Sequence, residues 1–163
     1  MSYRRYIICV LIKFKKPSKK LGGFFYMQKI GIDPDVDKNG VAIKNGDDIS
    51  LYNLTFFELF DKLKDLDKKN VRVYIECGFL NKSNWHKVGK GSAALNAKIG
   101  NNTGRNHEVA RKIVEMCKYL NLDYKEVKPT SRKIDAKQLK ALTGISKRTN
   151  QEQRDALMLI LGK

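Results

Sequence analysis

The sequence predicts an α/β fold built on one mixed sheet, in which an antiparallel meander of three strands is followed by parallel strands. Three short apolar runs are separated by turn-forming residues, with Asn39-Gly40 and Asn45-Gly46 as the turn signals. Two more strand-like runs follow, each after a stretch with helical periodicity, and two helical stretches end the chain. The predicted order is βββαβαβαα, and helical crossovers between strands favour parallel pairing.

The first three strands are predicted at QKIGID (28–33), GVAIKN (40–45) and DISLYN (48–53). Asn-Gly pairs are strong hairpin signals, so these runs should pair as neighbours. A helix of about three turns should follow, because Thr55 and Glu58 match a capping box and apolar residues recur at helical spacing after them.

The middle of the chain is predicted to contain one strand and one long loop. VRVYIE (71–76) alternates and is rich in β-branched residues, so it reads as a strand that ends on Glu76. Residues 78–103 contain four glycines and several amides but show weak periodicity. They predict a long surface loop, in which residues 92–99 could form a short helix.

The C-terminal part predicts three helices around a last strand. Residues 106–120 place apolar side chains on one helical face and basic ones on the other. YKEVKP (124–129) is a strand stopped by its proline. A short helix should begin at Asp135 and end at Gly144, and a final helix should begin at Asn150.

The charge of the chain indicates a polyanionic partner. The 163 residues have a formal net charge of +16, which favours nucleic acid, with a membrane surface as the competing explanation. No apolar run approaches the roughly 20 residues that span a bilayer, so no membrane partner is expected. Three scattered cysteines argue against a disulfide scaffold and a zinc site, and indicate a reducing, cytoplasmic setting.

Residues 1–26 form a basic leader with seven Lys or Arg and no acid. The leader lacks the features of a signal peptide, because its apolar core is short and no small-residue cleavage site follows. We interpret it as an accessory arm of doubtful order or as an over-long gene start. The compact domain is predicted to comprise residues 27–163, which still have a net charge of +9.

Four carboxylates form the candidate site. Asp33 ends the first strand directly before Pro34, and Glu76 ends the fourth. Glu152 and Asp155 are three residues apart on the final helix and can therefore face the same way. Taken singly, Asp33 could simply cap a turn, and the helix acids could be solvated surface charges. If all four converge, their repulsion calls for a hard cation, of which Mg²⁺ is the usual one.

Three motifs carry a resemblance to a known family: GIDP (31–34), YIECGF (74–79) and QEQRDALMLI (151–160). Over residues 27–161 the chain resembles the RuvC-type Holliday junction resolvases of the RNase H-like, or retroviral integrase, superfamily. The resemblance implies an RNase H-like mixed sheet with helices on both faces. It also implies two Mg²⁺ ions, replaceable by Mn²⁺, and assigns catalysis and metal binding to Asp33, Glu76, Glu152 and Asp155.

The resemblance further implies residues that contact DNA. Phe79 matches the aromatic residue that the family inserts at the junction crossover, although a core aromatic is an equally good reading. In the basic segment SRKIDAKQLK (131–140), Lys133 and Lys137 are the best candidates for phosphate contact. The remaining candidates for DNA binding are Lys82, Arg105 and Lys140.

The function expected from these features is metal-dependent cleavage of Holliday junctions or other branched DNA by a homodimer, because two symmetric cuts require two related sites. Two alternatives stay open: a nuclease for RNA–DNA hybrids or other branched substrates, and a nucleic-acid-binding module that does not cut. The chain departs from the family pattern at Asp35 and Asp37, where the first could join the metal site or only make a turn. Glu152 also replaces the more usual Asp or His.

Overall fold

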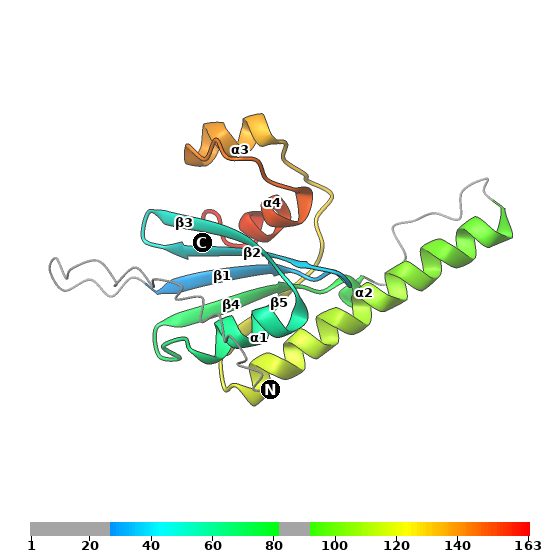
Figure 1. Ribbon diagram of the computed structural model, residues 1–163, viewed down its shortest axis with the longest axis horizontal. Helices are drawn as coiled ribbons and strands as arrows, with labels where there is room; N and C mark the ends of the chain where they lie inside the picture. The colour runs from blue at the N-terminus through cyan, green and yellow to red at the C-terminus, as the bar shows by residue number, and fades with distance from the viewer. Residues whose placement is uncertain (1–26, 82–91) are drawn as a thin grey trace, which may run out of the picture.

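The computed structural model describes residues 27–81 and 92–163 and shows a five-stranded sheet flanked by helices (Figure 1). The strand order is β3-β2-β1-β4-β5. β1 pairs antiparallel with β2, and β2 with β3, whereas β1–β4 and β4–β5 are parallel pairs. The strands are β1 (Gln28–Asp33), β2 (Asn39–Asn45), β3 (Asp48–Leu54), β4 (Val71–Glu76) and β5 (Asp123–Val127). The predicted mixed sheet, an antiparallel meander of three strands followed by parallel strands, is therefore confirmed.

The helices begin and end largely where the sequence signals place them. Thr55 and Glu58 form the predicted capping box, and Asp135 and Asn150 cap the last two helices in the same way. Gly144 adopts the left-handed conformation, with φ of 73°, that ends the third helix. The elements are α1 (Phe56–Lys64), a 3₁₀ turn η1 (Gly78–Leu80), α2 (Ala93–Tyr119), α3 (Ala136–Thr143) and α4 (Gln151–Met158).

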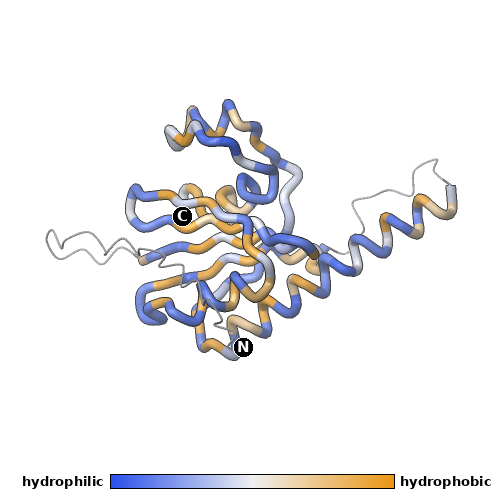
Figure 2. Tube along the Cα trace, in the orientation of Figure 1, coloured by the Kyte–Doolittle hydropathy of each residue, from blue (hydrophilic) through white to orange (hydrophobic). Residues whose placement is uncertain are grey.

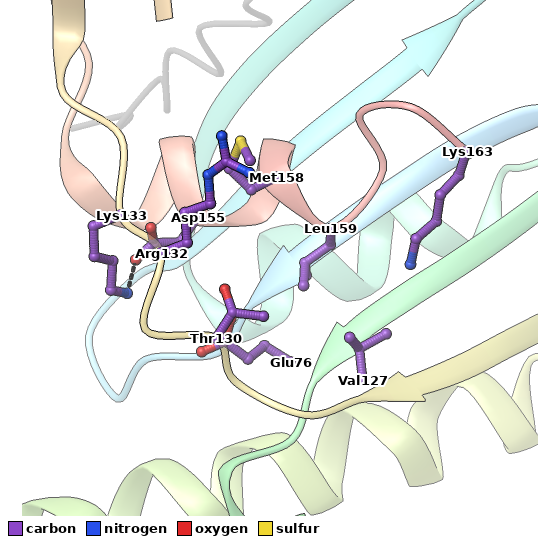
Figure 3. A pocket seen from close by; sticks show the side chains of 9 residues that line it. All are labelled: Glu76, Val127, Thr130, Arg132, Lys133, Asp155, Met158, Leu159 and Lys163. Atoms are coloured by element: carbon purple, nitrogen blue, oxygen red, sulfur yellow. Dashed lines mark hydrogen bonds and ion pairs between the residues drawn. The ribbon is translucent and has the colours of Figure 1, made fainter. Parts of the chain in front are cut away.

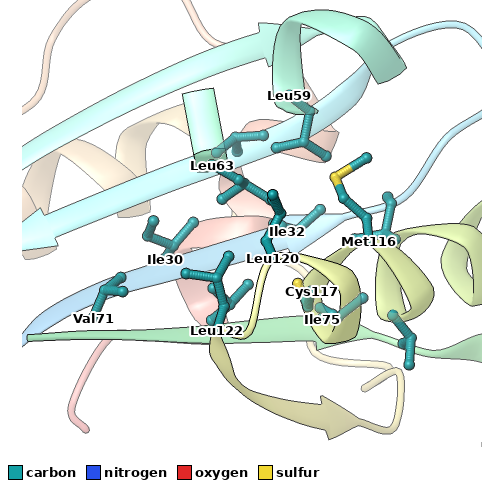
Figure 4. Packing of buried hydrophobic residues seen from close by; sticks show 14 of the residues in the cluster. Ile30, Ile32, Leu59, Leu63, Val71, Ile75, Met116, Cys117, Leu120 and Leu122 are labelled. Atoms are coloured by element: carbon teal, nitrogen blue, oxygen red, sulfur yellow. The ribbon is translucent and has the colours of Figure 1, made fainter. Parts of the chain in front are cut away.

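The sheet is covered on both faces, and the alternation of its strands decides which side chain faces which layer. Ile30 and Ile32 of β1 pack with α1 and α2 in one core, shown in Figure 4. Ala42 of β2 and Tyr74 of β4 point to the other face, where they pack with Ala156 and neighbouring residues of α4. Successive residues of each central strand therefore pack against helices on opposite faces of the sheet.

The prediction of a long surface loop over residues 78–103 is wrong at its C-terminal end, because the short helix allowed at residues 92–99 forms and continues without a break into the helix predicted over residues 106–120. α2 is one helix of 27 residues, and its N-terminal half projects beyond the sheet (Figure 1). Its middle is hydrophilic, as the blue and white stretch in Figure 2 shows, so it carries no apolar periodicity. Ser92 caps the first turn, and the packed half from Ala110 onward supplies the nucleus from which the helix extends.

The two cysteines in the described part of the chain are buried and unpaired. Burial raises the pKa of the Cys77 and Cys117 thiols to about 12, so both stay protonated at neutral pH. Among the described residues, no helix combines the length and the apolar character that crossing a bilayer requires. The predictions for the leader, residues 1–26, and for Lys82 lie outside the described residues.

Candidate functional site

Asp33 and Glu76 lie side by side at the ends of two parallel strands. The register pairs Ile32 of β1 with Ile75 of β4. The residues that follow them, Asp33 and Glu76, are therefore neighbours across the two strands. Because Ile32 and Ile75 belong to the core under α1 and α2, Asp33 and Glu76 face the opposite layer. This face of the sheet is the one covered by α4.

Two glycines let α4 approach the sheet closely enough to bring its acids to the strand ends. A Cβ atom on Gly31 would lie 1.9 Å from the carbonyl oxygen of Ala156, and one on Gly40 would lie 2.2 Å from that of Glu152. Gly40 is the cross-strand partner of Asp33. The helix backbone therefore rests directly on β1 and β2, and Glu152 is placed above the neighbour of Asp33.

The four predicted carboxylates come together electrostatically around Asp33. Burial, followed by the charges of Glu76 and Asp155, raises the pKa of the Asp33 carboxyl to about 8; Glu152 adds to the rise and Lys133 opposes it. Burial also raises the pKa of Glu76, where Lys133 again opposes the rise and Asp155 adds to it. The structure thus gathers at one edge of the sheet acids that are up to 122 positions apart in the sequence.

Lys133 is the basic residue that reaches this cluster. It lies in the connection between β5 and α3, and its ammonium group forms an ion pair with the buried Asp155 carboxylate (Figure 3). Burial alone would lower the pKa of Lys133, but the charges of Asp155, Glu76 and Asp33 raise it above its ordinary value. Lys133 therefore stays protonated and partly compensates the carboxylates.

Two residues of α4 that the sequence analysis did not single out fix Asp155 from the other side. The Gln151 side-chain amide donates to Asp155 at 2.7 Å, and the Arg154 guanidinium donates to the Gln151 carbonyl oxygen at 2.7 Å. Arg154 also donates to the backbone carbonyl oxygens of Ile134 and Thr149, at 2.9 Å each. Arg154 thus ties the segment that carries Lys133 to the helix that carries Asp155. The spacing of four residues from Gln151 to Asp155 was the available sequence signal.

Asp35 belongs to the turn after β1 rather than to the acid cluster. Its carboxylate accepts a hydrogen bond from the Asp37 backbone at 2.9 Å and one from the Asn106 side chain at 3.5 Å. Its own backbone N–H donates to Asn39 at 3.2 Å. Asp35 is also absent from the charges that shift the pKa of Asp33. Its hydrogen bonds hold the turn and join it to α2.

The other candidate DNA contacts are spread over the surface around the cluster. Phe79 is half-buried in η1, with its ring edge-on to His107 at 6.4 Å and under the Arg111 guanidinium at 4.7 Å. It is thus neither a fully buried core residue nor a bare ring. Three predicted basic residues are exposed on helices and do not shift the pKa of Asp33: Arg105 on α2, and Lys137 and Lys140 on α3.

The donor set of the cluster suits a hard divalent cation, because four carboxylates offer only oxygen. Within the described residues, no hydrogen bond or ion pair reaches the carboxylates of Asp33, Glu76 or Glu152. In the same part of the chain, no three His, Cys, Asp or Glu residues are already arranged to hold a metal ion. In the structure, Asp155 is paired with Lys133 instead.

The raised pKa of Asp33 predicts that the metal-free protein loses stability as the pH rises. The folded-state pKa of about 8 exceeds the ordinary value of 3.8, so between these values the folded state binds more protons than the unfolded state. The free energy of unfolding should therefore fall from about pH 4 to about pH 8. Thermal melts in EDTA at pH 5 and pH 8 should show a larger decrease in Tm for the wild type than for Asp33→Asn. Equal decreases would mean that Asp33 is ionised in the fold at pH 5.

Comparison with solved structures finds, among other matches, two structures of RuvC from Thermus thermophilus. "T. thermophilus RuvC in complex with Holliday junction substrate" is 12% identical, covers 82% of this chain and 90% of its own, and has a TM-score of 0.47. "Thermus thermophilus RuvC structure" is 11% identical, with the same coverage and a TM-score of 0.44. No protein-family model matches the chain, and no curated protein matches it.

Proposed function

We propose that this protein is a Mg²⁺-dependent endonuclease that cuts phosphodiester bonds in branched DNA, with Holliday junctions as its main substrate. The observation that carries the proposal is the gathering of Glu76, Asp155 and Glu152 around the partly buried Asp33 carboxyl, whose pKa is raised to about 8 by burial and by these three acids. Four carboxylates that lie close together repel one another, and a positive charge must compensate this repulsion. A divalent cation that acts on a phosphodiester supplies one.

In this proposal the four acids would bind the metal, with Asp33 and Glu76 positioned by strand ends and Glu152 and Asp155 by α4. Mg²⁺ bound by Asp33, Glu76, Glu152 and Asp155, as two ions or with Mn²⁺ in its place, would activate a water and stabilise the leaving oxygen. Arg154 and Gln151 hold Asp155 in place. Lys133, whose ammonium group lies beside the cluster and pairs with Asp155, would contact the phosphate that is cut.

The choice of nucleic acid as substrate is supported by charge. The net charge is +16, and the exposed basic residues Arg105, Lys137 and Lys140 lie on helices outside the acid cluster. The preference for branched DNA is supported by the three motifs GIDP, YIECGF and QEQRDALMLI, which contain all four acids. A homodimer is proposed because a junction is resolved by two symmetric cuts.

A comparison of three substrates tests this function. The protein is incubated with a synthetic four-way junction, a linear duplex of the same sequence and an RNA–DNA hybrid, each with Mg²⁺ and with EDTA. We expect paired, symmetric nicks in the junction alone, only with Mg²⁺. Degradation of the hybrid instead would assign an RNase H-type activity, and binding of the junction without cutting in either Mg²⁺ or Mn²⁺ would leave a binding module.

A further inference from the structure

A pocket of about 260 Å³ opens directly beside the acid cluster. Figure 3 shows it between the ends of β4 and β5 and the C-terminal part of α4, with Glu76 on the strand side and Asp155 on the helix side. The chemistry proposed above uses these two acids and Lys133, which also lines the pocket, but does not use the remaining lining residues.

One wall of this pocket is apolar, although charged residues make up much of its lining. Val127 of β5 is the cross-strand partner of Glu76, so the row across the parallel strand ends runs from Asp33 through Glu76 to Val127. Leu159 faces this row from the helix side, and Met158 lies next to it (Figure 3). Neither a cation nor a phosphate gains from such a wall, whereas a flat heteroaromatic ring does.

The rim of the same pocket is cationic. Arg132 and Lys163 are exposed and line it together with Lys133. The Lys163 ammonium lies 4.5 Å from the centre of the Tyr74 ring, which holds it over the sheet beside the pocket. A ligand that satisfies both the wall and the rim must combine a flat apolar part with a negative charge.

We propose that this pocket receives the nucleotide next to the phosphate that is cut. Its base lies against Val127 and Leu159, and its own phosphate is held by Arg132 and Lys163. The proposal rests on the proposed nuclease function and adds a place where the substrate strand is read. The volume of about 260 Å³ is below the roughly 300–1,000 Å³ of pockets for drug-sized ligands and accommodates one base but no base pair. The base must therefore leave its stack, which costs least where pairing is already interrupted, as at a junction.

The test uses four-way junctions with a fluorescent 2-aminopurine at each position around the cut site, and the wild-type protein in EDTA so that no cutting occurs. We expect a change in fluorescence at one position next to the cut phosphate, and roughly tenfold weaker binding when that base alone is removed, as for the loss of a buried apolar contact. Val127→Phe, which fills the pocket, should abolish both effects. A signal that is uniform along the strand, or unchanged in Val127→Phe, would overturn the proposal.

Because Val127→Phe could disturb folding, variants of exposed residues at the rim of the pocket provide an independent test. Arg132→Ala should reduce the fluorescence change and the penalty for the missing base, whereas Lys128→Ala removes an exposed cation of the same connection that does not line the pocket. Equal effects of the two variants would contradict the proposal. So would competition by free dAMP at concentrations equal to the strand, since it would assign the pocket to a small nucleotide.

The two proposals fail in different ways. Cutting of the junction without any dependence on a flanking base would remove the subsite and leave the nuclease function. A position-specific fluorescence signal without cutting in any divalent metal would remove the nuclease function and leave a pocket that binds a base.

Discussion

Asp33→Asn is expected to abolish cleavage of a four-way junction while binding of the junction is retained. The amide has nearly the same size as the carboxyl group but cannot ionise to supply the anionic oxygen that the proposed cation would bind among Glu76, Glu152 and Asp155. We expect a loss of about 10³-fold or more in the single-turnover rate, equivalent to about 4 kcal/mol of barrier. Binding, which depends on the basic surface, should change little. Rates are measured on labelled junction in Mg²⁺, and affinity by electrophoretic mobility shift in EDTA.

Asp35→Asn is the matched control, because it makes the same change two residues away. The two oxygens of Asp35 accept one hydrogen bond each, from the Asp37 backbone at 2.9 Å and from Asn106 at 3.5 Å, and the single oxygen of an asparagine can still accept the shorter one. This variant should cut at a rate within a few fold of the wild type. Normal cutting by Asp33→Asn would remove Asp33 from the site, and equal losses in both variants would extend the site to Asp35.

Gly31→Ala is expected to destabilise the protein by about 3 kcal/mol or more, at the upper end of the cost of overpacking a core. The new Cβ would lie 1.9 Å from the carbonyl oxygen of Ala156 and 2.9 Å from its carbonyl carbon, which are backbone atoms of α4 that cannot rotate away. The helix must therefore move off the sheet and take Glu152 and Asp155 with it. Urea titration measures the stability, and the junction assay should show a loss of cutting even where the variant is folded.

Gly104→Ala is the matched control, because the same substitution at this position should not destabilise the protein. Gly104 lies in the exposed part of α2, and a Cβ there meets nothing within 4 Å. Alanine should therefore be neutral or stabilise the helix by about 0.5–1 kcal/mol. If Gly31→Ala is as well tolerated as Gly104→Ala, then α4 does not rest on β1 as described.

The fold could be predicted from the sequence because its signals are local. The Asn-Gly pairs make the turns of the meander, and each of α1, α3 and α4 begins at a capping box written in consecutive residues. The positions of Asp33 and Glu76 at strand ends were also predicted, since each directly follows an apolar run. Their proximity then follows from the parallel pairing of β1 with β4.

The parts that could not be predicted depend on contacts between distant segments. The N-terminal half of α2 has no apolar face of its own, and its helical state extends from the packed half. Among several lysines of residues 131–140, only the tertiary structure shows that Lys133 pairs with Asp155. The role of Gly31 and Gly40 is likewise invisible without α4 above them. Periodicity, caps and turns do not encode these contacts.

The binding of Mn²⁺, followed by electron paramagnetic resonance, tests most directly whether the four acids form one divalent-cation site. Mn²⁺ is titrated into the wild type, Glu76→Gln and Asp35→Asn in the absence of DNA. Saturable binding by the wild type and by Asp35→Asn, weakened at least tenfold in Glu76→Gln, is the expected result. Identical binding by the wild type and Glu76→Gln would contradict a metal site at the strand ends, and with it the proposed nuclease mechanism.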